Sequence, residues 1–249
     1  MDWVKRCEED LNRMANEVFE TPELKRYFAG PLTWPAHHVK RVMWSRHANP
    51  MHRDCWAYVM AAAPIDAKQV IWRHEEDELI FDERLGRAHV AWDEDEEEVQ
   101  GQGAEIPEPP PGVLVACWGR VHIAKNSPWL EGLAASHILE RLNNPKVIKN
   151  GLTLSRRGAD QVMNDLKVPF EKLSRSARVH LDADEEHSAL TWTIFERHVK
   201  DREDFEQALR GAKRSLACFR VYAAAVGDLM AQVSKSGQAH DLETDSDRG

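Results

Sequence analysis

Three side chains within one short stretch of the sequence, residues 180–187, could bind a metal ion. His180, Asp184 and His187 are spaced four and three residues apart, which places them on one stripe of a helix with 3.6 residues per turn. Neutral imidazole and carboxylate are ligands that suit iron, manganese or zinc. The spacing also fits a solvated helix face on which Asp184 is simply an ion partner of His187. The stretch is therefore a metal-site hypothesis that depends on the rest of the chain.

The elements that must position these residues are predicted to be helices. Apolar residues recur at three- and four-residue spacings, and strand-like two-residue alternation is not sustained in any segment. Proline after threonine, or soon after it, marks helix starts near Thr21 and Thr33. The sequence predicts an all-α protein, a single bundle of about seven helices, with long or site-bearing helices over 2–20, 67–82, 128–142, 175–198 and 202–230.

A change in composition interrupts the helical pattern near the middle of the chain. An acidic run at 93–98 is followed by glycines and then by the proline-rich stretch 107–112. Like charges repel and consecutive prolines prevent helix formation, so we predict an exposed loop over 93–112. The helices on either side could not close a core alone. We therefore predict one domain over 1–236 and a polar, disordered tail over 237–249.

Composition also excludes several classes of function. The formal net charge is −9 and no basic patch is present, which argues against a nucleic-acid partner. The four cysteines form no CxxC pair, which argues against a zinc ribbon and a disulfide framework. No apolar leader and no run of about 18 apolar residues is found. We expect a soluble, cytoplasmic protein with no membrane partner.

Four stretches carry a resemblance to a known family. Residues 21–35 lead from a helix through Gly-Pro-Leu-Thr into a new helix, 64–78 ends in acidic residues, and Glu140 stands in His-Ile-Leu-Glu. Together with 180–187, and in this order, they resemble the haem-oxygenase-like superfamily. That superfamily includes thiaminase II, the pyrroloquinoline quinone biosynthesis oxidase and non-haem di-iron oxidases and oxygenases. The resemblance implies a haem-oxygenase-like helical bundle.

The resemblance also implies a ligand set for two metal ions. In the di-iron branch a glutamate of the third helix and a histidine seven residues later are ligands, and Glu78 and His89 take these places eleven residues apart. Eleven residues make nearly three helical turns and seven nearly two, so both side chains can share a face. Glu75, Glu76 and Asp82 remain alternatives to Glu78. The implied set is Glu78, His89, Glu140, His180, Asp184 and His187.

Three carboxylates and three imidazoles suit two ferrous ions with positions open to dioxygen. The resemblance thus implies a non-haem di-iron oxidase or oxygenase, with two Fe(2+) per chain, dioxygen as co-substrate and no catalytic residue beyond the ligands. Its substrate would be a small amino-acid-derived or carboxylate-bearing metabolite, changed by N-oxygenation, desaturation or carbon–carbon cleavage. Helical bundles of this size often dimerise, so a homodimer is also open.

The alternative is a metal-free protein of the same fold. It would be an enzyme similar to thiaminase II or the quinone-biosynthesis oxidase, or a module that binds a small heterocycle. Thiaminase II needs a cysteine nucleophile near a carboxylate, and neither Cys55 nor Cys117 lies in such a setting in the sequence.

Several polar residues also have ordinary structural interpretations. His74, next to two glutamates, is expected at the surface, and Glu140 could pair with Arg141 or Arg157. Arg156 and Arg157 fit a solvated loop better than a site for a substrate carboxylate. The nine tryptophans are expected mostly in the core, with one or two lining a pocket.

Overall fold

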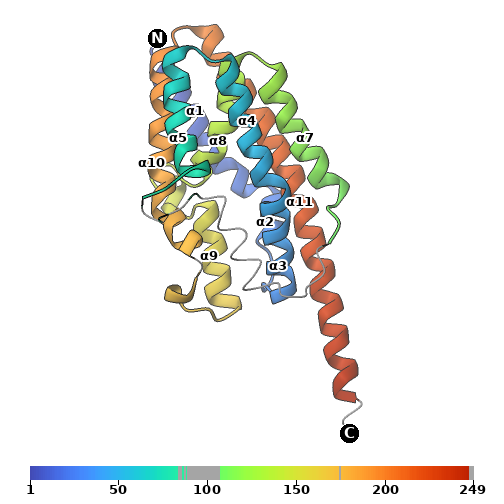
Figure 1. Cartoon of the computed structure of the whole chain (residues 1–249). Helices are drawn as coiled ribbons and strands as arrows, with labels where there is room; N and C mark the ends of the chain where they lie inside the picture. Colours follow the sequence, from blue (N-terminus) through green and yellow to red (C-terminus); the bar gives the residue numbers. More distant parts are fainter. Residues whose placement is uncertain (84–85, 87, 89–106, 174, 247–249) are drawn as a thin grey trace.

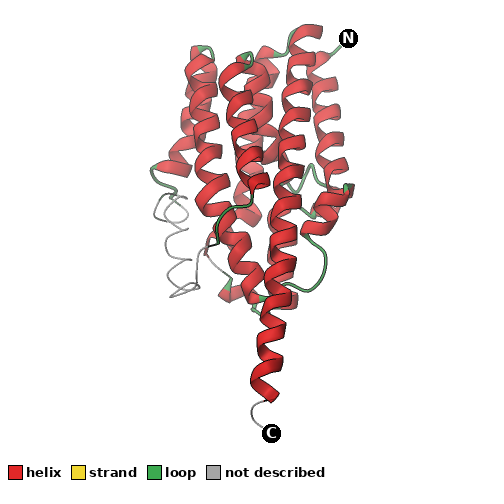
Figure 2. Cartoon of the chain, turned by 90° about the vertical axis from the view of Figure 1, so that its right-hand side faces the viewer, coloured by secondary structure: helices red, strands yellow, loops and turns green. Residues whose placement is uncertain are grey.

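The computed structural model of the chain describes residues 1–83, 86, 88, 107–173 and 175–246. For residues 175–176, 179–180, 182–184 and 236–246 it describes only the backbone. The all-α prediction is confirmed, because the described residues form helices and connecting turns without a strand. The helices run alongside one another as an elongated bundle (Figure 1, Figure 2).

The described residues hold more helices than the seven that the sequence predicted, because glycine and proline breaks separate short helices near the N-terminus. A π-helical turn, Trp44–Ala48, joins the third helix to the fourth. The α-helices are α1 (Trp3–Glu17), α2 (Pro22–Tyr27), α3 (Trp34–Met43), α4 (Asn49–Ala62), α5 (Ile65–Leu79), α7 (Pro111–Asn126), α8 (Trp129–Leu142), α9 (Leu154–Asp165), α10 (Arg175–His198) and α11 (Arg202–Ser246).

Side-chain caps and prolines fix where several helices begin. The side chains of Asp2, Thr33 and Thr153 each accept a hydrogen bond from a backbone N–H in the first turn of α1, α3 and α9. Such caps satisfy backbone donors that have no partner inside the helix. Pro22 and Pro35 occupy the first turns of α2 and α3, where a missing N–H costs nothing. The predicted helix starts near Thr21 and Thr33 are thus confirmed.

Helix α8 lies at the centre of the bundle and is buried at every residue from Leu130 to Leu142. Helix α11 packs along it at unusually close range. A Cβ atom built on Gly211 would lie 1.9 Å from the carbonyl oxygen of Glu131. The absence of a side chain at Gly211 therefore lets the two helix backbones touch, and this contact fixes the position of α8.

Within the described residues, one helical span, Arg202–Lys235 of α11, is long and apolar enough to cross a membrane. This is weak evidence for a membrane span, because core helices of soluble proteins have the same length and composition. The span supplies core residues of the bundle, among them Ala212, Phe219 and Val226. The structure is compatible with the soluble protein that the sequence predicted.

Three predicted boundaries differ from the structure. Helix α5 ends at Leu79 rather than 82, and α7 begins at Pro111, inside the predicted loop 93–112. The part of that loop up to 106 lies outside the described residues. Helix α11 continues to Ser246 instead of ending near 230, and its last part projects beyond the bundle (Figure 1, Figure 2). The backbone of 237–246 is thus helical where we predicted disorder, since extending a packed helix costs far less than nucleating one.

The contact between α8 and α11 can be tested by adding one methyl group. We expect Gly211→Ala to lower the free energy of unfolding by about 1–3 kcal/mol, the range for overpacked cores, as measured by urea denaturation. Gly158→Ala in α9 is the control, because the nearest atom to its new Cβ is the Lys40 Nζ at 3.9 Å. That variant should be neutral or more stable by up to about 1 kcal/mol. Equal stabilities of the two variants would contradict the close approach.

Candidate metal centre

The candidate site lies inside the bundle where α5, α8 and α10 meet. Helix α5 supplies His74, Glu75 and Glu78, which share one face, while α8 supplies Glu140 and α10 supplies His187. Helices α5 and α10 lie side by side (Figure 1). All five side chains are buried, and His74 has no exposed surface at all. Unpaired buried charge is costly. The charged side chains of this cluster therefore need partners that compensate their charge.

Three of these residues form a potential ligand set. The ligand atoms of His74, Glu140 and His187 all lie within 4.8 Å of one another. The two imidazole rings meet edge to face with their centroids 4.8 Å apart. The Nε2 atom of His74 lies 3.7 Å from Glu140 Oε1, and no hydrogen-bond partner for it exists among the described residues. A buried nitrogen without a hydrogen-bond partner that faces a carboxylate fits a metal ion, because imidazole and carboxylate are suitable ligands.

Glu75 orients His74 for this role. His74 Nδ1 lies 2.9 Å from Glu75 Oε1. An ionised carboxylate only accepts hydrogen bonds, so Nδ1 carries the proton and Nε2 presents its lone pair to Glu140. Histidines that bind metals are commonly held by a carboxylate in this way. Trp56 packs against the same ring, with centroids 4.8 Å apart, and helps to fix it.

Glu140 is oriented and kept ionised from the other side. Arg120 on α7 donates to His52 Nδ1, and His52 Nε2 lies 3.0 Å from Glu140 Oε1. A guanidinium only donates, so the His52 Nε2 proton points to Glu140. Burial and the nearby charges of Arg120 and Arg53 lower the pKa of His52 to about 3, which makes it a neutral donor. Burial alone would raise the pKa of Glu140, but the hydrogen bond from His52 and the nearby positive groups hold that pKa below its ordinary value.

Two more carboxylates of α5, those of Glu78 and Asp77, reach the cluster at His187. Glu78 Oε1 lies 3.4 Å from His187 Nδ1, and Asp77 Oδ2 lies 3.3 Å from His187 Nε2. Both nitrogens of this imidazole therefore face carboxylates, although only one nitrogen of a neutral ring carries a proton. Arg53 on α4 joins the carboxylates, with its guanidinium 2.9 Å from Glu75 and 3.3 Å from Glu78.

The structure brings together three of the six predicted ligands, Glu78, Glu140 and His187. His180 and Asp184 lie on α10 with His187, but only their backbone is described. His89 lies outside the described residues. Whether these six residues bind metal therefore stays a prediction.

The alternatives to Glu78 divide by burial. Glu75 is buried at the cluster, Asp82 is buried, and Glu76 is exposed. Glu140 pairs with His52 rather than with Arg141 or Arg157. Arg156 and Arg157 lie in helix α9 rather than in the loop that the sequence predicted, and they are engaged locally, Arg156 with Asp160 and Arg157 with the Leu152 carbonyl.

The prediction that His74 lies at the surface is wrong. Two acidic neighbours suggested a solvated face, but Glu75 points inward beside His74 while Glu76 is exposed. The available signal was the spacing Ile71, His74, Glu75 and Glu78, which follows one helix face. Ile71 is fully buried. His74, three residues later on the same helix face, is therefore expected in the core.

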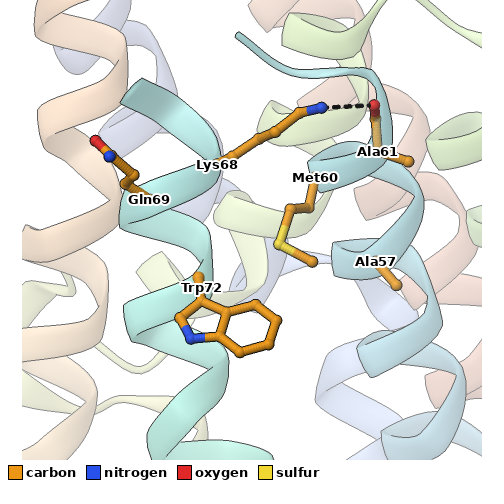
Figure 3. A pocket seen from close by; sticks show the side chains of 6 residues that line it. All are labelled: Ala57, Met60, Ala61, Lys68, Gln69 and Trp72. Carbon is orange, nitrogen blue, oxygen red and sulfur yellow. Dashed lines mark hydrogen bonds between the residues drawn. The ribbon is translucent and has the colours of Figure 1, made fainter. Parts of the chain in front are cut away.

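A pocket of about 500 Å³ opens on the outer side of α4 and α5 (Figure 3). Its lining residues are Ala57, Met60, Ala61, Lys68, Gln69 and Trp72. Lys68 donates a hydrogen bond to the Ala61 carbonyl across the pocket. None of these residues belongs to the cluster, so the pocket and the candidate metal centre are distinct features. Trp72 is exposed here, in contrast to Trp56 in the core.

The comparisons with known proteins identify a fold and no family. No family model matches the chain, and no curated protein matches it. Two crystal structures of a CADD-like protein of unknown function from Nostoc punctiforme match nearly the whole chain. The first has a TM-score of 0.68 at 14% identity, covering 91% of this chain and 98% of that one. The second has a TM-score of 0.61 at 12% identity, covering 92% and 96%. The likeness establishes a shared helical fold, while the haem-oxygenase-like resemblance is not confirmed.

The cluster predicts which histidines a metal ion needs. His74→Ala and His187→Ala should each weaken Mn²⁺ binding by at least about tenfold, the lower end for disturbed metal sites, as measured by calorimetric titration. His122→Ala is the control, because His122 is exposed on α7 and its ring forms a hydrogen bond with the neighbouring Asn126 on the same helix. Unchanged binding in both cluster variants would contradict the assignment of these ligands.

His137 is a buried imidazole with a structural role. Arg141 Nε donates to its Nε2 at 2.8 Å, so its Nδ1 donates to Thr191 Oγ1 at 2.8 Å. Burial and the charge of Arg141 hold the pKa of His137 well below its ordinary value. The two polar groups that α8 places among its buried residues at these positions, His137 and Glu140, thus both have hydrogen-bond partners.

A pH titration tests this environment. The unfolded chain binds a proton at His137 below about pH 6.5 while the folded protein does not, so stability should fall as the pH drops through that value. In His137→Gln the loss of unfolding free energy between pH 7.5 and 5.5 should be smaller by on the order of 1 kcal/mol, measured by urea denaturation. His122→Gln should retain the wild-type dependence. An unchanged loss in His137→Gln would show that this imidazole charges freely in the folded protein.

Proposed function

We propose that this protein is a non-haem iron enzyme that uses dioxygen to oxidise a small molecule. The observation that carries the proposal is the buried set of His74, Glu140 and His187, drawn from three helices, in which an imidazole nitrogen faces an ionised carboxylate. Mixed imidazole and carboxylate ligands are those of non-haem iron sites. Ferrous iron, when bound, supplies the electrons for dioxygen activation.

The finer part of the proposal is a site for two ferrous ions. A carboxylate-bridged pair of metal ions in a helical bundle is built from glutamates and histidines that project inward from several helices. Glu75 and Glu78 add two carboxylates beside Glu140. His180 and Asp184 share a helix stripe with His187, and we propose them as the remaining ligands from α10, with His89 from the segment that follows α5.

The protein's own residues provide orientation and exclusion of water. Glu75 holds the proton of His74 on Nδ1, and His52 donates to Glu140, so both ligands are set before any ion arrives. The burial of these side chains keeps bulk water away from the site and strengthens its electrostatics. We propose a small amino-acid-derived or carboxylate-bearing substrate, oxidised by N-oxygenation, desaturation or carbon–carbon cleavage, and a soluble, cytoplasmic enzyme.

A second candidate function is a metal-free protein that binds a small heterocycle. The observation in its favour is Arg53, which compensates the buried carboxylates without any metal ion. A nucleophilic cysteine is not supported, because burial raises the pKa of Cys117 to about 11 and also raises that of Cys55. Both thiols are therefore protonated at neutral pH, whereas the thiolate is the nucleophile.

Anaerobic loading with ferrous ion separates the two candidates. We expect about two iron ions per chain after gel filtration, the number for a carboxylate-bridged pair, and a transient visible absorption on rapid mixing with dioxygen. His187→Ala should lose both signals, while His122→Ala should keep them. Absence of bound iron in the wild-type protein, or iron uptake that is the same in His187→Ala, would leave the metal-free function as the better account.

A further inference from the structure

A single arginine lies among the carboxylates of the candidate site. The Arg53 guanidinium lies 2.9 Å from Glu75, 3.3 Å from Glu78 and 3.9 Å from Glu140. Each of these side chains is at least nine-tenths buried. Arginine seldom lies in such a place unless its charge is used. It therefore holds the position between α5 and α8 where three negative groups converge.

We propose that Arg53 takes the place of a second cation in the metal-free protein, so that metal ions enter in two steps of unequal affinity. The first ion binds between His74, Glu140 and His187. The second enters only when the guanidinium moves away from Glu75 and Glu78. This inference rests on the proposed metal site and adds to it a device that controls how many ions the site holds.

Arg53 is an arginine that contacts all three of these carboxylates in the described part of the chain. Arg120 donates to His52 rather than to a carboxylate, and Arg141 donates to His137 and Asn12. Removing the partner of a buried ion pair leaves an uncompensated charge, which is strongly destabilising. Arg53 therefore supplies positive charge that the three glutamates share in the metal-free fold.

The guanidinium must move to make room, because it cannot give up its proton. The guanidinium of arginine stays protonated in proteins. A second divalent ion would therefore meet an existing positive charge, and like charges repel strongly at such distances. The Arg53 Nε atom has no hydrogen-bond partner among the described residues. No hydrogen bond at Nε therefore has to break when the guanidinium moves.

The test is an anaerobic titration with Mn²⁺, counting free ions by electron paramagnetic resonance. In the wild-type protein we expect one tight ion and a second that binds at least tenfold more weakly. In Arg53→Gln the second ion should bind at least tenfold more tightly than in the wild type. The metal-free variant should also melt at a lower temperature than wild type and recover on adding two equivalents of Mn²⁺.

Two further variants isolate the role of the charge. Arg53→Lys keeps the positive charge and should keep the two unequal steps. Arg141→Gln removes a buried arginine that does not contact the three glutamates, so it should lower stability without changing the second step. If Arg53→Gln folds only when Mn²⁺ is present, the inference is supported, because the metal then replaces the missing charge.

The possible failures are distinguishable. Wild-type protein that binds no Mn²⁺ and no Fe²⁺ would overturn the proposed metal site and this inference together. Wild-type protein that binds metal, with a second step unaltered in Arg53→Gln, would overturn the inference alone. An Arg53→Gln variant that stays unfolded with Mn²⁺ present would also contradict it, since two added cations should compensate the carboxylates.

Discussion

The compensation of buried charge is the constraint on which the interior of this bundle depends. Glu75, Glu78 and Glu140 lie out of contact with bulk water, and each would cost several kcal/mol if left unpaired. Arg53 compensates them from α4 and the imidazoles contribute from α5 and α10. Four helices are therefore tied to one polar centre, and the surrounding apolar core holds them at the distance which that centre needs.

The same requirement explains features far from the cluster. Helix α8 carries Glu140 and is buried along its length, so it must be covered on every side. The contact at Gly211 allows α11 to cover one of these sides at backbone distance. The hydrogen bonds from Arg120 through His52 to Glu140 extend the order of the site outward to α7. A change in any of these supports should alter the geometry of the ligands.

Local sequence signals were sufficient for the fold class and for many helix starts. Threonine and proline at the start of α3 act within one turn, and apolar periodicity reports the buried face of each helix. The projecting end of α11 could not be predicted, because its polar composition resembles that of a disordered tail. The count of about seven helices was too low, although the start of a short helix such as α2 was marked by threonine followed by proline.

The candidate site was predictable only where the order of residues along the chain carried the information. Glu78, Glu140 and His187 were expected together and lie together. His74 was missed because its neighbours in sequence are acidic, whereas its burial is decided by Trp56 and His187 on other helices. Nothing local marks Arg53 as a buried counter-ion, since its partners lie 22 or more residues away in the chain.

The most direct test of the account is to locate the metal ion itself. Crystals of the protein loaded with Mn²⁺ should give an anomalous difference peak between His74, Glu140 and His187, with ligand atoms about 2.0–2.3 Å away, as usual for divalent metals on nitrogen and oxygen. A peak elsewhere in the bundle, or no peak at a saturating Mn²⁺ concentration, would contradict the assignment of this cluster as a metal centre.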